Sequence, residues 1–172
     1  YDNKNRILPW RVNKTSPKTL YYRLLSEFML QQTQVKTVIP YFIKFTQRYK
    51  TLASLSKANE TQILKLWEGL GYYRRARNLL ASTKLLVKEH NSKLPNTLKE
   101  IKKLPGVGDY TANALMGFIH NYQTIAIDGN VRRVFARYLN HKETKNKFEK
   151  LIDANQKNLF IIKKNSNLIE DI

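Results

Sequence analysis

The sequence predicts an all-α protein, and three observations support this prediction. Apolar residues recur at helical spacing in nearly every long segment. Residues typical of helix starts precede several of these segments. No convincing pair of alternating segments indicates strands, and no internal repeat is present. With 172 residues and 42% apolar content, the chain can build one domain, or one domain and a smaller part of another.

The first half of the chain contains three predicted helices. Ser16 followed by Pro17 predicts the start of the first, because proline suits the first helical turn. The second runs from Gln34, and Pro40 should bend or weaken it by removing one helical hydrogen bond. Asn59 with Gln62 resembles a capping box that starts the third. Their apolar faces are Leu20, Leu24, Leu25 and Phe28; Val35, Val38, Ile39, Phe42, Phe45 and Tyr49; and Ile63, Leu64, Leu66 and Trp67.

The second half continues in the same way after Gly69-Leu70-Gly71 ends the third helix. Residues 76–87 form one apolar face, and Thr97 with Glu100 opens a short helix that reaches Leu104. Two more helices are predicted over residues 112–119 and 128–139. Beyond about residue 140, one helix is expected over 143–152. The last fifteen residues could form a weak helix, a frayed end or the end of a truncated product.

Net charge indicates the class of partner. The chain has 31 Lys and Arg against 13 Asp and Glu, a formal charge of +18. Such a field favours a polyanion, because each neutralised phosphate releases counterions. A Lys/Asn-biased genome or an acidic lipid surface could also explain the charge, but no strongly basic amphipathic helix supports the lipid surface. No apolar run long enough for a membrane span and no secretory signal is seen, although residues can precede Tyr1.

Metal and disulfide chemistry is not expected within this chain. It has no cysteine, which excludes disulfides, zinc thiolates and cysteine-held iron–sulfur clusters here. The histidines His90, His120 and His141 are scattered without the spacing of a ligand set. The sequence therefore predicts no metal site.

A glycine turn, Gly106-Val107-Gly108, lies between two predicted helices. Glycine permits backbone angles that other residues resist, and it lets main-chain N–H groups approach a ligand closely. Together with the positive end of the following helix, the turn would make a seat for a DNA phosphate. An ordinary tight turn between antiparallel helices explains the same local pattern equally well.

The wider pattern distinguishes the two interpretations, because five motifs occur in one order along the chain. They are LPWR (8–11), SEFMLQQTQVKTVIPYF (26–42), LWEGLGYYRRARNL (66–79), LPGVGDYTANAL (104–115) and IDGNVRRVFARY (127–138). Together these motifs closely resemble those of the bacterial adenine DNA glycosylases of the helix–hairpin–helix superfamily. The glycine turn alone is a weak signal, whereas the Glu-Phe-Met-Leu-Gln-Gln-Thr run with the later Ile-Asp-Gly-Asn is highly specific.

The resemblance implies a fold and an activity. The expected fold is a six-helix barrel with the hairpin over residues 20–126, beside a partial second helical domain from residues 1–19 and 127–172. The implied reaction hydrolyses the N-glycosidic bond of adenine mispaired with 8-oxoguanine or guanine, after the nucleotide has rotated out of the stack. The implied partner is double-stranded DNA with an adenine mismatch, bound by a monomer in the bacterial cytoplasm, in association with the nucleoid.

The sequence also departs from the family. The four cysteines that hold the family's 4Fe–4S cluster, and the C-terminal domain that reads the oxidised guanine, are absent from these 172 residues. We therefore expect no cofactor within this chain, and whether a cation binds at the hairpin is left open. Three functions stay open: an active adenine glycosylase, a DNA-binding remnant without catalysis, and a glycosylase for another damaged base.

The resemblance assigns four candidate catalytic residues. Glu27 lies among apolar residues that should raise the pKa of its carboxyl, and it matches the general acid that protonates adenine; an exposed helical Glu is the alternative. Asp128 fits an N-cap and matches the aspartate that stabilises the sugar cation, while Asn130 matches a supporting residue or merely lies in the first helical turn. Tyr110 occupies the position where bifunctional relatives have a Schiff-base lysine, so base removal without efficient strand cleavage is expected. Packing at the helix base is the alternative for Tyr110.

The remaining candidates would contact DNA or the extruded base. Gln32 and Tyr72 match residues that penetrate the duplex around the oxidised guanine, although an exposed helical position and core burial are their respective alternatives. Trp10 and Arg11 match pocket residues around the adenine, with a core anchor as the alternative for Trp10. The backbone of Gly106, Val107 and Gly108 would bind a phosphate. Arg74, Arg75 and Arg77 would line the phosphate path or form a solvated helix face.

Overall fold

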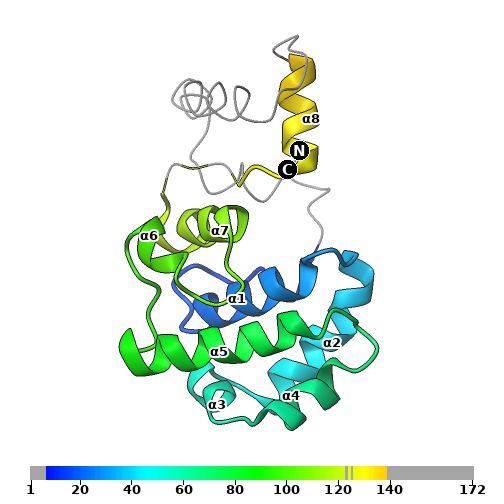
Figure 1. The fold of residues 1–172 in the computed structure, drawn as a ribbon, viewed down its shortest axis with the longest axis vertical. Coiled ribbons are helices and arrows are strands. Elements are labelled where there is room, and N and C mark those ends of the chain that lie inside the picture. Colours follow the sequence, from blue (N-terminus) through cyan, green and yellow to red (C-terminus); the bar gives the residue numbers. More distant parts are fainter. Residues whose placement is uncertain (1–6, 123, 125, 139–172) are drawn as a thin grey trace. The chain divides into compact units, whose positions relative to one another are not determined.

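The computed structural model of the protein describes residues 7–122, 124 and 126–138 (Figure 1). These residues form helices and connecting turns, with no strand among them, so the predicted all-α class is confirmed. No helix in these ranges is long and apolar enough to cross a membrane. The chain divides into two compact units, Tyr1–Val107 and Gly108–Ile172, which are described separately.

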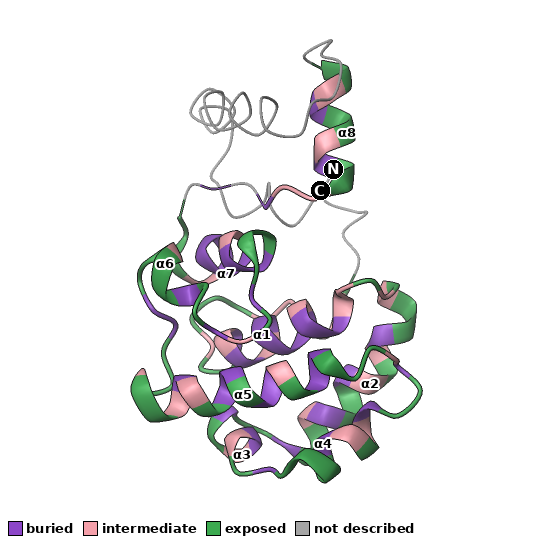
Figure 2. Cartoon of the chain, in the orientation of Figure 1, coloured by how far each residue is buried: buried purple, intermediate pink, exposed green. Residues whose placement is uncertain are grey.

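The first unit contains six helices. They are α1 (Thr19–Leu30), α2 (Val35–Arg48), α3 (Leu52–Ser56), α4 (Glu60–Trp67), α5 (Arg74–Glu89) and α6 (Leu98–Ile101). Helix α5 is central, because α1, α3 and α4 all pack against it, while α2 packs on α1 and α4 (Figure 1). Buried residues follow one face of α5 and exposed residues the other (Figure 2).

The core of this unit is rich in aromatic rings. Phe45 meets Trp67 edge to face with 5.7 Å between ring centroids, and Phe42 meets Trp10 in the same way at 5.3 Å. Edge-to-face pairs add to the stabilisation from burial alone. The largest fully buried side chains are Trp67, Phe28, Phe42, Phe45, Leu24, Leu25, Met29, Leu55, Ile63, Leu79 and Leu86. The apolar faces predicted from the sequence supply most of these residues.

Helix starts agree with the prediction where a side chain can cap the helix. The Asn59 side chain accepts a hydrogen bond from Gln62 N, Gln62 returns one to Asn59 N, and α4 follows. Helix α2 continues through Pro40. The start of α1 differs, because the Ser16 hydroxyl bonds Lys18 N within a preceding turn and the helix begins at Thr19. Helix α3 was not predicted, because five residues are too few to show a period.

The second unit is smaller in its described part. It contains α7 (Asp109–His120) and α8 (Gly129–Tyr138). Phe118 and Ala114 of α7 form a small apolar cluster with Ala126, against which Ile119 packs. This cluster joins α7 to the segment after it. The domain boundaries expected from the resemblance, with a barrel over residues 20–126, stay a prediction. The helix predicted over 143–152 and the tail lie outside the described residues.

Candidate active site and DNA interface

The predicted proton donor, Glu27, lies on α1. Its sequence neighbours Ser26 and Phe28 are buried, and Glu27 is partly buried. Burial raises the pKa of its carboxyl from 4.5 to about 7, and the positive charge of Arg23, one helical turn earlier, opposes that rise. Although part of the residue reaches the surface, desolvation is the larger influence. A carboxyl with this pKa can hold a proton near neutral pH, as general acid catalysis requires.

Asp128 lies directly before α8 in the second unit. One of its carboxylate oxygens, Oδ1, accepts hydrogen bonds from the backbone N–H groups of Asn130 and Val131, each at 2.8 Å. The other oxygen accepts from the Asn130 side chain at 3.2 Å. Asp128 is therefore the N-cap that the sequence predicted, and Asn130 supports its carboxylate. The two backbone amides and the Asn130 side chain hold the carboxylate in place at the start of α8, and a carboxylate held in this way can act on a sugar cation by electrostatic attraction.

The segment before Asp128 is held by a hydrogen bond that the sequence did not predict. The buried Thr124 hydroxyl donates to Asn113 Oδ1 at 2.7 Å, and the amide nitrogen of Asn113 donates to Asp109 O at 2.9 Å. Asn113 therefore ties α7 to a residue shortly before Asp128. No local pattern predicts this contact, because it joins two polar residues eleven positions apart.

Gly106 is the hairpin position at which the structure most strongly requires glycine. Its φ is +79°, in the left-handed region that favours glycine. A Cβ at Gly106 would lie 2.6 Å from Asn78 Nδ2 and 2.7 Å from Asn78 Cβ, so the turn rests directly on α5. Ser82 of the same helix donates to Pro105 O at 2.8 Å. Gly108 has an ordinary φ of −89°, nothing lies within 4 Å of its Cβ position, and it is the N-cap of α7, where glycine is common. Neither its backbone nor its surroundings require glycine there.

Val107 supports the turn instead of offering its own amide to a ligand. Its side chain is buried, and its backbone N–H donates to Leu104 O at 3.1 Å. The Val107 amide is already used within the turn, and binding of a phosphate by the hairpin backbone stays a prediction. Exposed Gly106 and Gly108 lie on either side of it, and α7 begins immediately after Gly108.

Gln32 and Tyr72 are exposed and lie at the ends of two different elements. Gln32 follows α1 and Tyr72 precedes α5, and both have left-handed backbones, with φ of 57° and 49°. Such angles are uncommon outside glycine and occur often at functional sites. Core burial, the alternative for Tyr72, is excluded because 62% of the residue is exposed.

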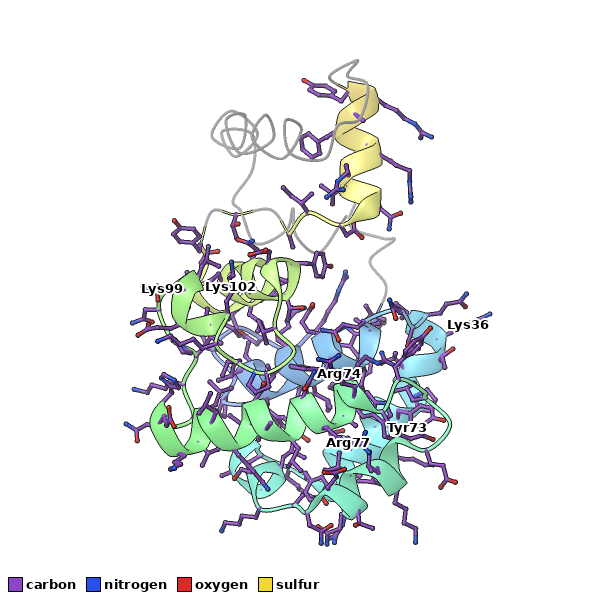
Figure 3. The ribbon with its side chains drawn as sticks, viewed as in Figure 1. Lys36, Tyr73, Arg74, Arg77, Lys99 and Lys102 are labelled. Carbon is purple, nitrogen blue, oxygen red and sulfur yellow. The ribbon has the colours of Figure 1, made fainter. Side chains whose placement is uncertain are left out.

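The three arginines at the start of α5 differ from one another. Arg74 is exposed and has no hydrogen-bond or ion-pair partner within the described ranges. Arg77, labelled with Arg74 in Figure 3, is half-exposed. Its Nε donates to Glu60 at 2.6 Å. A surface pair of this kind contributes little, about 0–1 kcal/mol, so a phosphate could replace Glu60. Arg75 is buried, and the prediction that it lines a phosphate path or a solvated face is therefore wrong.

The remaining candidates are the pocket residues Trp10 and Arg11, the catalytic candidate Tyr110 and the hairpin cation. Trp10 is buried against Phe42, the position of a core anchor, and Arg11 beside it is partly buried. Tyr110 is exposed in the first turn of α7, so tight packing at the helix base does not describe it. Contact of Trp10 or Arg11 with an extruded base stays a prediction. The same holds for a hairpin-bound cation, and no cluster of potential metal ligands occurs in the described segments.

Comparison with known proteins identifies the family. The family described as HhH-GPD superfamily base excision DNA repair protein matches residues 25–157. The chain therefore belongs to this superfamily, and the resemblance and the helix–hairpin–helix glycosylase fold expected from the motifs are confirmed.

Named relatives give more detail. An adenine DNA glycosylase of Buchnera aphidicola subsp. Baizongia pistaciae is 45% identical over 147 residues, which span 86% of this chain and 41% of the relative. The adenine DNA glycosylase of Homo sapiens is 41% identical over 142 residues, or 80% of this chain and 26% of the relative. The chain thus spans less than half the length of these relatives.

Solved structures show the same fold. A thermostable thymine-DNA glycosylase matches with a TM-score of 0.66 at 28% identity, covering 77% of this chain and 59% of that one. A trapped endonuclease III–DNA covalent intermediate matches with a TM-score of 0.72, covering 88% of this chain and 70% of that one. Its identity is 23%, so this second likeness concerns the fold alone.

Proposed function

We propose that this chain carries the catalytic region of an adenine DNA glycosylase, acting as a monomer on double-stranded DNA. The substrate would be adenine mispaired with 8-oxoguanine or guanine, and the reaction hydrolysis of its N-glycosidic bond. The observation that carries the proposal is the Glu27 carboxyl with a pKa of about 7, in a chain whose named relatives are adenine DNA glycosylases.

In this mechanism the two carboxyl groups have different roles. Protonated Glu27 donates its proton to the adenine ring, which makes the base a better leaving group. As the bond breaks, positive charge develops on the sugar, and the ionised Asp128 stabilises it. Water then completes hydrolysis. Tyr110 offers no amine, so no Schiff base forms and the strand is left with an intact abasic site.

The experiment uses a duplex with one adenine opposite 8-oxoguanine, followed by hot alkali to cleave abasic sites. Product with the wild-type chain, and at least a hundredfold slower single-turnover product formation with Glu27→Gln, is expected (general acid–base catalysis contributes roughly 10²–10⁴-fold). The matched control is Glu89→Gln at an exposed position, which should leave the rate unchanged. Tight binding without product would overturn catalysis in favour of a DNA-binding remnant. Product only on another lesion would overturn the choice of adenine.

Salt and pH give two further checks on the proposal. Affinity should fall steeply with salt, because the charge of +18 acts on phosphates, and a flat response would remove the phosphate-binding argument. The single-turnover rate should fall as pH rises above about 7, because Glu27 then loses the proton that it must donate.

A further inference from the structure

Arg75 is a buried cation that donates its hydrogen bonds to backbone carbonyls. It is 7% exposed, in contrast to Arg74 and Arg77 on the same helix. A buried charge must be hydrogen-bonded to be tolerated, because leaving water costs it its solvation. Its two terminal nitrogens meet this requirement by bonding two separate turns of the chain, while the buried Nε has no hydrogen-bond partner among the described residues.

One terminal nitrogen of Arg75, Nη1, bonds the end of α1. It donates to Phe28 O at 3.3 Å, to Met29 O at 2.8 Å and to Gln31 O. The last carbonyls of a helix lack partners within the helix and carry its negative dipole end. The arginine therefore supplies both the donors and the opposite charge at the turn that leads into Gln32.

The other terminal nitrogen, Nη2, bonds the loop that follows α4. It donates to Leu70 O and Gly71 O, each at 3.3 Å. Trp67 Nε1 also donates to Gly71 O, at 2.9 Å. The guanidinium carbon lies 5.5 Å from the centroid of the Trp67 ring and 5.2 Å from that of Tyr72, within cation–π range. Arg75 thus holds the loop that leads into Tyr72 through two carbonyl groups of the loop and through the Tyr72 ring.

The two turns have a further property in common. Gln32 and Tyr72 both adopt positive φ, and strained residues of this kind persist only when the surrounding structure holds them in place. Because Nη1 and Nη2 belong to one planar group, they fix the spacing between the two turns. A lysine could not do so, since it has a single nitrogen on a flexible stem.

We propose that Arg75 is a positioning residue that holds Gln32 and Tyr72 as one rigid pair, ordered before the pair enters a DNA duplex. The inference rests on the proposed function, in which both side chains penetrate the duplex. Opening a base step costs stacking energy. A pair that is ordered beforehand does not add the entropic cost of fixing two loops on binding.

The first experiment needs no DNA. Hydrogen exchange is measured on the folded chain for peptides that cover residues 30–34 and 68–73, in the wild type, Arg75→Lys and Arg75→Gln. We expect faster exchange in both peptides of both variants and unchanged exchange in the middle of α5. Arg77→Lys, an exposed position on the same helix, is the matched control and should change neither peptide. Unchanged exchange, a change in one peptide only, or global unfolding of both variants would overturn the proposal.

The second experiment measures discrimination between duplexes in a Glu27→Gln background, which should not turn over. The quantity is the ratio of affinities for a duplex with adenine opposite 8-oxoguanine and for the fully paired duplex. Arg75→Lys should lower this ratio by roughly tenfold or more, because small misplacements of positioned groups have large effects. Combined with Tyr72→Ala, the same change should have a smaller effect, since one of the two side chains through which Arg75 acts is then missing.

Additive effects of the two changes would overturn the proposal for Arg75. A wild-type ratio near one would instead contradict the proposed function, and the exchange experiment would still decide whether Arg75 orders the two turns. The two failures are therefore distinguishable.

Discussion

Replacing Glu27 with glutamine should stabilise the folded chain at alkaline pH, although under the proposed function it slows base removal at least about a hundredfold. The folded-state pKa of Glu27 is about 7 against an ordinary value of 4.5, so the native state binds more protons than the unfolded state between these pH values. Stability therefore falls as pH rises from about 4.5 to 7 and is level above that window. The shift corresponds to about 3 kcal/mol at most, because one pKa unit is worth about 1.4 kcal/mol.

Glutamine cannot ionise, so this loss should be absent from the variant. The assay is chemical unfolding followed by tryptophan fluorescence, since Trp10 and Trp67 are both buried in the first unit. The difference in unfolding free energy between Glu27→Gln and the wild type should grow by about 2–3 kcal/mol between pH 4.5 and pH 8.5. Glu89→Gln, at an exposed position, should show no such growth. A difference that stays constant with pH would refute the argument that Glu27 is desolvated.

Four other substitutions test the remaining parts of the site. Gly106→Ala should destabilise the chain by at least about 1 kcal/mol, from its left-handed φ and its contact with α5, and should weaken DNA binding. Gly108→Ala should fold normally and weaken DNA binding alone; equal melting temperatures for the two variants would contradict this reasoning. Tyr110→Lys should form a covalent DNA complex that borohydride traps, and failure to trap it while base removal persists would show that position 110 does not face the sugar. Asn113→Ala should lower the free energy of unfolding by about 1 kcal/mol and slow base removal. An unchanged rate would show that this hydrogen bond does not position the segment before Asp128.

Much of the fold follows from local sequence signals. The Asn59–Gln62 box and the apolar period that reaches Trp67 are sufficient to predict α4. The capping role of Asp128 was equally local, because its partners lie within three residues. Helix α3 was missed although Thr51 and Ser54 form a capping box, since a five-residue helix shows no period.

The roles of individual polar residues depend on tertiary contacts and were predicted less well. The three arginines in the run Arg74-Arg75-Ala76-Arg77 cannot be told apart by residue type, yet only Arg75 is buried. A signal for this was present, because Arg75 precedes Leu79 by four positions and therefore shares its face of the helix. The contact of Asn113 with Thr124 left no such signal, because nothing in a single sequence pairs two distant polar residues.

The capping of α8 by Asp128 has a consequence for damaged or mutated forms of this protein. The carboxylate is held by the first amides of the very helix that it starts, so an event that frays this helix also releases the carboxylate. Gln32, Tyr72 and the arginine that joins their turns belong to the other unit and do not depend on those amides. If the proposed function holds, such a form would keep the two turns that are proposed to enter the duplex but would lose the ordered carboxylate. Under the proposed function, substitutions near the start of α8 should therefore impair base removal more than DNA binding.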